Sequence, residues 1–317
     1  MISAIRSSSP RIRAILCVLL GIVFYTANDS TIKWLSGGYP LHEIVLFRAA
    51  VALGFTLIIV QLEGGFSILR VRRPGLHILR GLLVMCANMG FFLGLATLPL
   101  AENTAIFFLA PLFITALAVP ILGERASALR WAAVLTGFLG VVIMVRPGSG
   151  VIQITALLPV GGALAYALMQ MMTRKLGVRD KASTLAFYVH ATYIVACVSI
   201  WTIAGDGRFS DGSDPTIDFL FRRWIWPGND DLLLMVLAGF LVAMAGYLVS
   251  QAYRLSEAAV IAPFEYLALP LAVFWGYQLW GDLPDFISVL GMVLIAGSGL
   301  FVFYRETMKG RSLAGRR

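Results

Sequence analysis

Ten apolar stretches, each close to the length that crosses a bilayer, dominate this chain and leave little sequence for any other structure. A helix needs about 20 predominantly apolar residues to span the hydrocarbon core of a bilayer. Hydrophobic residues make up 59% of the 317. We therefore predict an all-α, multi-pass membrane protein whose ten spans cover residues 14–35, 41–61, 76–97, 102–121, 128–145, 153–173, 184–204, 232–253, 258–280 and 286–304.

The basic residues gather in alternate connecting segments, and this pattern predicts the orientation of the chain. Cytoplasmic loops of membrane proteins carry an excess of Lys and Arg, and this excess sets the orientation. Both termini are therefore expected in the cytoplasm, and the net charge of +8 is an orientation signal rather than a nucleic-acid surface. The basic residues of the inner segments are Arg6, Arg11, Arg13, Arg70, Arg72, Arg73, Arg80, Arg125, Arg130, Arg174, Lys175, Arg179, Lys181, Arg254, Arg305, Lys309, Arg311, Arg316 and Arg317. Only Lys33 and Arg48 are expected inside spans.

Two segments in opposite halves of the chain resemble each other. Leu100 to Ile106 opens the fourth span and Leu255 to Ile261 opens the ninth, and each span contains two prolines and ends in glycine followed by an acid. Five spans per half is an odd number, so the second copy must enter the bilayer from the other face. Inverted repeats with matching proline-interrupted helices are typical of secondary transporters, although membrane helices also simply tolerate proline. We predict two inverted five-helix repeats, over residues 14–147 and 150–305. A cytoplasmic tail is expected on each side of them, over residues 1–13 and 306–317.

Three ionisable residues are expected about 10 Å inside their spans, where a charge is costly. Asp29 and Arg48 lie at matched depths from one face, and Glu265 lies as deep from the other. Intramembrane charges usually face a bundle interior or a water-filled path and mark a transport route. The structural alternatives are a salt-bridge network for Asp29 and Arg48, and a protonated, hydrogen-bonded acid for Glu265. Glu265 is the strongest candidate, because no basic residue lies within a helical turn of it.

Further polar residues are candidates for binding or gating. Asp29 and Lys33 are four residues apart with the acid first, an order that favours an ion pair on a helix, and Arg48 is the other possible partner of Asp29. The remaining candidates can either line a cavity or join helices by hydrogen bonds, and they are Asn28, Asn88, Tyr166 and Gln170.

Motifs of enzymes and channels are absent from the sequence. It contains no phosphate-cradling P-loop, no zinc-binding His-Glu-x-x-His motif and no nucleophile elbow, and its three cysteines are too far apart for a metal site. We therefore expect no catalytic residues, no metal and no cofactor, and any energy coupling must come from ion or solute gradients. An intramembrane lipid-modifying enzyme would need an acid/base constellation, and a channel would need a filter motif.

Several local strings resemble the EamA-like branch of the drug/metabolite transporter superfamily, whose members contain two five-helix repeats. They look most like the bacterial S-adenosylmethionine uptake carriers, and they are also similar to riboflavin and amino-acid carriers of that superfamily. The resemblance covers about residues 12–305. The strings are Ala27-Asn28-Asp29, Lys33-Trp34-Leu35, Glu43 followed by Phe47-Arg48, His77-Ile78-Leu79-Arg80-Gly81-Leu82-Leu83, and Ala262-Pro263-Phe264-Glu265-Tyr266-Leu267.

The resemblance implies a multi-pass carrier of the bacterial inner membrane that moves a small organic metabolite by alternating access. Its expected partners are a small-molecule substrate, such as S-adenosylmethionine, and the lipid bilayer, with no nucleic acid. Riboflavin, amino acids and drugs are the alternative substrates. The resemblance also implies which residues line or gate a cavity between the two repeats, namely Asn28, Asp29, Arg48, Glu265 and Tyr266.

Overall fold

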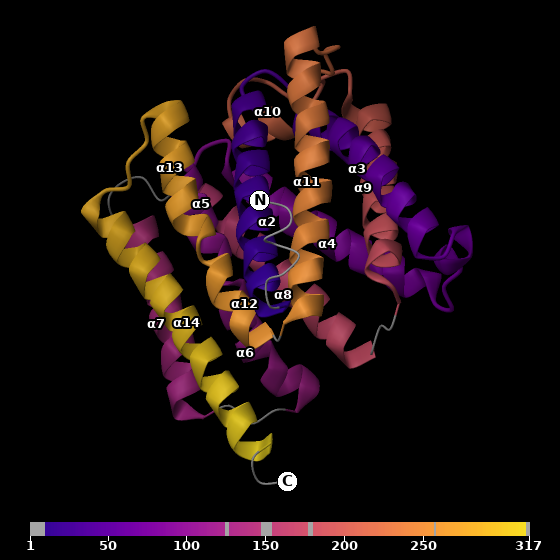
Figure 1. The fold of residues 1–317 in the computed structure, drawn as a ribbon. Coiled ribbons are helices and arrows are strands. Elements are labelled where there is room, and N and C mark those ends of the chain that lie inside the picture. The colour runs from indigo at the N-terminus through magenta and orange to yellow at the C-terminus, as the bar shows by residue number, and fades with distance from the viewer. Residues whose placement is uncertain (1–9, 124–126, 147–153, 177–179, 257, 315–317) are drawn as a thin grey trace.

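The computed structural model describes residues 10–123, 127–146, 154–176, 180–256 and 258–314. Within these ranges the fold is entirely helical, without strands (Figure 1). Eight of the described helical segments are long and apolar enough to cross a membrane. The predicted class, an all-helical membrane protein, is therefore confirmed, and the count of ten spans stays a prediction.

The helices follow the expected spans closely, with two spans divided in the middle. In chain order they are α2 (Pro10–Leu35), α3 (Leu41–Glu63), η1 (Phe66–Leu69), α4 (Pro74–Gly94), α5 (Leu100–Phe107), α6 (Ala110–Leu122), α7 (Ala128–Val145), η2 (Ile154–Ala156), α8 (Leu157–Leu176), α9 (Ala182–Ala204), α10 (Pro215–Phe221), α11 (Asn229–Leu255), α12 (Ala258–Glu265), α13 (Ala268–Trp280) and α14 (Phe286–Ala314).

The two divided spans have the same construction. Each consists of an 8-residue helix, a break and a 13-residue helix, namely α5 and α6 in the first half and α12 and α13 in the second. Pro111 follows the first break and Pro270 follows the second; proline lacks the N–H that would continue the helical ladder. Both 13-residue helices end at a glycine with positive φ, 71° at Gly123 and 72° at Gly281. The predicted interruption of the fourth and ninth spans is confirmed.

The register of the repeat differs from the expected one. Because α5 begins at Leu100 and α12 at Ala258, Leu100 corresponds to Ala258 and not to Leu255. The matching strings at 100–106 and 255–261 are therefore offset from the structural repeat, and Glu257 lies outside the described residues.

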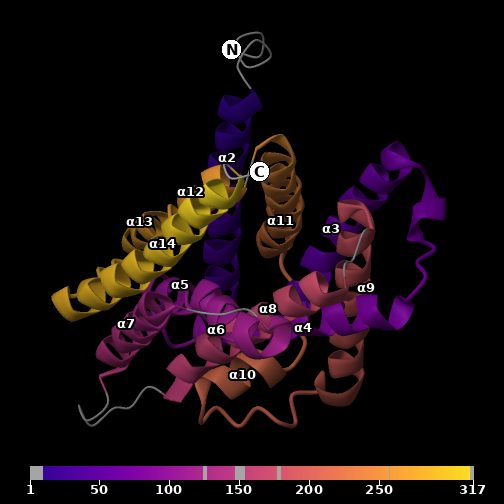
Figure 2. The same ribbon diagram turned by 90° about the horizontal axis from the view of Figure 1, so that it is seen from below.

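Helix packing also repeats between the halves. Helix α2 packs against α11 as α8 packs against α4, while α3 packs against α9 and α7 against α14 (Figures 1 and 2). Glycine allows the first two contacts to be close. Gly21 faces Ala245 of α11, and Gly162 faces Ala87 of α4. Small residues at helix contacts are common in membranes, where van der Waals packing drives association.

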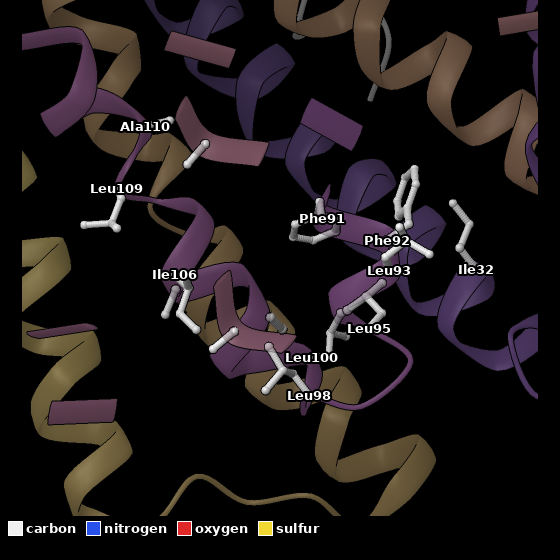
Figure 3. Packing of buried hydrophobic residues seen from close by; sticks show 14 of the residues in the cluster. Ile32, Phe91, Phe92, Leu93, Leu95, Leu98, Leu100, Ile106, Leu109 and Ala110 are labelled. Atoms are coloured by element: carbon white, nitrogen blue, oxygen red, sulfur yellow. The ribbon is translucent and has the colours of Figure 1, made fainter. Parts of the chain in front are cut away.

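Part of the hydrophobic core lies where α2, α4 and α5 meet. It gathers Ile32 of α2 with Phe91 and Phe92 of α4 and Leu100 and Ile106 of the α5 segment (Figure 3). These residues are at most 7% exposed. The core therefore fixes the end of α2, which carries several candidate polar residues.

The helix pair α3–α9 is tied to a loop at each end. At one end the buried His42 and Glu43 side chains contact α10 and the segment after it: His42 Nδ1 lies 3.0 Å from the Leu220 carbonyl of α10, and Glu43 accepts from the Ile225 N–H at 3.3 Å. At the other end the Thr184 and Tyr188 hydroxyls donate to the carbonyls of Ile68 and Leu69 at 3.2 and 3.1 Å. We call the first end the α10 face and the opposite end, where α14 finishes, the terminal face.

Candidate functional site

Asp29 lies in the last third of α2 and does not pair with Lys33. The Asn28 amide donates to Asp29 Oδ1 at 3.0 Å, and Arg48 is near enough to attract the carboxylate electrostatically. Lys33 instead donates to the Leu98 carbonyl at 2.7 Å and lies 4.0 Å from Asp282. The ion pair favoured by the four-residue spacing is therefore wrong, because Lys33 finds its partners in neighbouring loops.

Arg48 is buried between two aromatic rings. Its side chain is only 5% exposed, and its guanidinium carbon lies 4.9 Å from the Phe92 ring and 5.7 Å from the Tyr193 ring. Cation–π contacts of this kind stabilise a guanidinium that has lost water. Among the described residues Arg48 forms no ion pair closer than 4.0 Å, so its surroundings are those of a firmly packed cation.

Glu265 is the last residue of α12 and stands directly before the helix break. The Tyr253 hydroxyl of α11 donates to Glu265 Oε1 at 2.6 Å. The expected absence of a basic residue within a turn holds, but the carboxyl group is not alone. The sequence could not identify Tyr253, because no local spacing links a residue of one span to a residue of the next.

Tyr266 occupies the break itself. Its ring stacks on that of Phe108, with 4.8 Å between centroids, and its hydroxyl is buried without a hydrogen-bond partner among the described residues. A buried hydroxyl without a partner is unfavourable by roughly 1–3 kcal/mol. The hydroxyl packs against Gly299 of α14, where an added Cβ would lie 2.0 Å from it.

Tyr25 joins the candidate residues of both halves, although sequence reasoning missed it. It lies one helical turn before Asp29, and its hydroxyl interacts electrostatically with Asp29, Arg48, Tyr166 and Glu265. We call these five residues, Tyr25 included, the central polar cluster. Tyr25 remains 36% exposed despite its position in the middle of the bundle.

A periodic sequence signal could have revealed Tyr25. The first helix of each half carries glycine, tyrosine, a polar residue and a base at every fourth position. The two series are Gly21, Tyr25, Asp29, Lys33 and Gly162, Tyr166, Gln170, Arg174. Residues four apart lie on one face of a helix, so each series marks a single polar face.

Asn88 and Gln170 are engaged in hydrogen bonds. The Asn88 amide donates to the Tyr193 hydroxyl and to the Val84 carbonyl, so it joins α4 to α9. The Gln170 amide donates to the Tyr166 hydroxyl at 3.1 Å. Gln170 thus supports the central polar cluster, whereas Asn88 lies beside it.

Arg80 lies deeper than the charge pattern predicted. It was expected in an inner connecting segment, but α4 begins at Pro74 and places Arg80 in its second turn, inside a candidate span. Its charge interacts with the Tyr166 phenol, and its Nε is buried without a partner among the described residues. Which basic residues lie inside the membrane stays a prediction, because the candidate spans are assigned by length and composition alone.

Several side-chain contacts join helices and loops on the α10 face. Lys33 lies 5.2 Å from the Trp280 ring centroid, and the Ser288 hydroxyl donates to Glu102 at 2.7 Å. Arg146 pairs with Asp285, and this hydrogen bond, followed by those from Ser288, lowers the pKa of Asp285 to about 2. These contacts connect α2, α5, α13 and α14 at one face.

The first half of the chain matches a known family. Residues 12–146 fit the profile of the EamA-like transporter family. These residues are similar to an EamA-like transporter domain. The match confirms the resemblance to the EamA-like branch of the drug/metabolite transporters.

Relatives over nearly the whole chain are also transporters by name. The S-adenosylmethionine uptake transporter of Rickettsia prowazekii is 27% identical over 91% of this chain and 91% of its own length. The riboflavin transporter of Rhizobium johnstonii is 29% identical over 98% of this chain and 97% of its own. The pseudopaline exporter CntI of Pseudomonas aeruginosa is 26% identical over 89% and 92%.

One solved crystal structure shares the fold. Its TM-score is 0.60 at 18% sequence identity, and the alignment covers 95% of this chain and 99% of the other. At this identity the likeness concerns the fold alone.

Proposed function

We propose that this protein is a secondary carrier that moves a small organic metabolite across the bacterial inner membrane by alternating access. The observation that carries the proposal is that Asp29 and Glu265, one from each half, both act electrostatically on Tyr25, and that Glu265 ends the first helix of an interrupted span. Transporter binding sites are commonly built at such interrupted helices, near the midplane between repeats. The relatives named as transporters support the same function.

The proposed topology has ten spans in two inverted five-helix repeats, over residues 14–147 and 150–305, with both termini in the cytoplasm. Helix α8 supplies the sixth span, since its apolar part runs over Leu157–Thr173. Helices α12 and α13 together supply the ninth, as α5 and α6 supply the fourth. The boundary between the repeats lies outside the described residues.

S-adenosylmethionine or a related compound is the proposed substrate. It carries a sulfonium, an ammonium and an aromatic base. The carboxylates of Asp29 and Glu265 complement cations, and the stacked rings of Phe108 and Tyr266 provide an aromatic surface. Riboflavin, the substrate in the names of other relatives, is the second candidate because it presents a large aromatic ring system without requiring paired carboxylates.

The proposed cycle uses the breaks after Phe107 and Glu265 as bending points. Lys33, held by the Leu98 carbonyl and Asp282, and Glu102, held by Ser288, close the α10 face. Release of these contacts would open that face while α6 and α12 close the other. Substrate near Glu265 would compete with the Tyr253 hydroxyl for the carboxylate.

The test is uptake of labelled S-adenosylmethionine into proteoliposomes, with and without trapped unlabelled compound, at two pH values. We expect saturable uptake that trapped compound accelerates, and its loss in Glu265→Gln. Asp206→Asn, which makes the same chemical change at an exposed loop residue, should transport normally. Normal uptake by Glu265→Gln would remove Glu265 from the mechanism, and uptake of riboflavin alone would replace the substrate.

A further inference from the structure

Arg80 differs from Arg48 and Lys33, the two cations predicted inside spans, and shares with Arg13 a buried Nε that has no partner among the described residues. Arg48 is held between aromatic rings, and Lys33 is bound by the Leu98 carbonyl and Asp282. Arg80 is half-buried with its Nε inaccessible to solvent, yet among the described residues its only recorded electrostatic partner is the neutral phenol of Tyr166. A buried guanidinium N–H without a partner is costly, and an anion bound at Arg80 would remove that cost.

The helix that packs on α4 brings an amide, not an acid, to the level of Arg80. Helices α4 and α8 run antiparallel, because Gly94 faces Pro159 while Gly90 faces Gly162. Gln170 lies about two turns beyond Gly162, and Arg80 lies about two turns before Ala87, which Gly162 contacts. Gln170 and Arg80 are therefore at similar depths.

The internal repeat shows that a carboxylate is absent from residue 170, at the depth of Arg80. Gln170 occupies the position in its series that Asp29 occupies in the other. Its amide donates to Tyr166, so it offers Arg80 no negative charge. An acid at residue 170 would neutralise Arg80, whereas glutamine leaves the guanidinium available.

Tyr166 connects Arg80 with the acidic side of the central polar cluster. Its phenol interacts electrostatically with both Arg80 and Glu265. A solute beside Tyr166 can therefore meet a cation at one end and a carboxylate at the other. This arrangement complements a molecule that carries both charges.

We propose that Arg80 binds the carboxylate of the transported solute, so that this carrier selects zwitterions over simple cations. The inference rests on the proposed carrier function and deepens it by naming the substrate class. A guanidinium binds a carboxylate through two parallel, charge-assisted hydrogen bonds. Lysine would keep the charge at this position but lose the paired geometry.

The experiment compares two labelled compounds that differ by one group, S-adenosylmethionine and its decarboxylated form. Both are offered to proteoliposomes containing wild-type protein, Arg80→Gln, Arg80→Lys or Gln170→Glu. In the wild type we expect the KM of the decarboxylated compound to be at least about tenfold higher, as the loss of one charge-assisted pair implies. In Arg80→Gln the KM of S-adenosylmethionine should rise to that level, while the KM of the decarboxylated compound changes by less than about twofold.

Two further variants separate binding from folding. Gln170→Glu keeps Arg80 but supplies a competing carboxylate, so it should reproduce the selectivity loss of Arg80→Gln. Arg80→Lys should show an intermediate KM. Arg72→Gln removes the same side chain from an exposed position before α4 and should leave both KM values unchanged.

The outcomes distinguish the inference from the function on which it rests. Equal KM values for the two compounds in the wild type, or an equal rise for both in Arg80→Gln, would overturn the role of Arg80 and leave the carrier standing. Absence of uptake of both compounds by folded wild-type protein would overturn the proposed substrate class and the inference together. Selective loss of S-adenosylmethionine affinity in both Arg80→Gln and Gln170→Glu would support the inference.

Discussion

Phe108 and Tyr266 occupy equivalent places in the two halves and stack on each other. Each directly follows an 8-residue helix and begins the break in its span, and their ring centroids lie 4.8 Å apart with 33° between the ring planes. The two interruptions of the bundle therefore touch through an aromatic contact. We therefore expect a bend at one break to displace the aromatic ring at the other.

Tyr266→Ala should lower the melting temperature in detergent, because it removes one ring of this contact. Such aromatic pairs contribute about 0.5–1.5 kcal/mol beyond the area that they bury. Tyr266→Phe keeps the ring and removes only a buried hydroxyl without a described partner, so the melting temperature should stay the same or rise slightly. Transport assays then report separately on the hydroxyl. A higher KM in Tyr266→Phe at unchanged stability would mean that the solute contacts it, and a large loss of stability would contradict this reading.

Gly162→Ala should destabilise the bundle more than Gly21→Ala. A Cβ at residue 162 would lie 2.6 Å from the Ala87 carbonyl oxygen, which is part of a helix backbone and cannot move away. At residue 21 the nearest atom is a methyl group of Val249 at 2.8 Å, which can rotate. Overpacking of this kind typically costs about 1–3 kcal/mol. Thermal unfolding would measure the difference, with Gly54→Ala as the control, because nothing lies within 4 Å of a Cβ there.

Lys33 should be energetically coupled to Asp282 and not to Asp29. The ammonium lies 4.0 Å from Asp282 and donates to the Leu98 carbonyl, while Asp29 is occupied by Asn28. In double-mutant cycles of unfolding, Lys33→Met with Asp282→Asn should give a coupling of about 0.2–1 kcal/mol. Lys33→Met with Asp29→Asn should give a coupling close to zero. A larger coupling of Lys33 to Asp29 than to Asp282 would instead support the ion pair that the four-residue spacing favours.

The Arg146–Asp285 pair should persist through the whole physiological pH range. The pKa of Asp285 is lowered to about 2, first by the hydrogen bond from Arg146 and then by those from Ser288. A depressed pKa stabilises the folded state above the unfolded pKa, near 3.9, and this contribution is lost as pH falls toward 2. The difference in melting temperature between wild type and Asp285→Asn should therefore be constant from about pH 5 to 8. It should shrink in high salt, since the pair is exposed.

The sequence predicted the class of fold and the interrupted spans, since both depend on local chemistry. Runs of apolar residues require a membrane, and prolines such as Pro111 and Pro270 disrupt the helical ladder wherever they occur. The same local reasoning gave a repeat register that is wrong by three residues. It matched Leu100 to Leu255 because the two strings are similar, whereas the structure matches Leu100 to Ala258. The four-residue series that begins at Gly21 contained a second repeat signal.

The partners of the charged residues could not be predicted in the same way. Tyr253 reaches Glu265 from the preceding span, and Lys33 turns from Asp29 toward Leu98, because distant loops and helices meet only in the folded chain. Arg80 was counted with the loop because basic residues near span ends usually mark orientation. The predicted span 76–97 already contained residue 80, and the start of α4 at Pro74 places Arg80 in the second turn of the helix.

The loop contacts at the two ends of α3 and α9 have a mechanical consequence. His42 and Glu43 fasten one end, and Thr184 and Tyr188 fasten the other, so this pair has no free end that can swing. On the far side of the bundle, α7 and α14 stand beside the two broken spans (Figure 2). We therefore expect α3 and α9 to keep their positions during the transport cycle. The helices on the opposite side, α7 and α14 with the two broken spans, would then move relative to α3 and α9 by bending at the breaks.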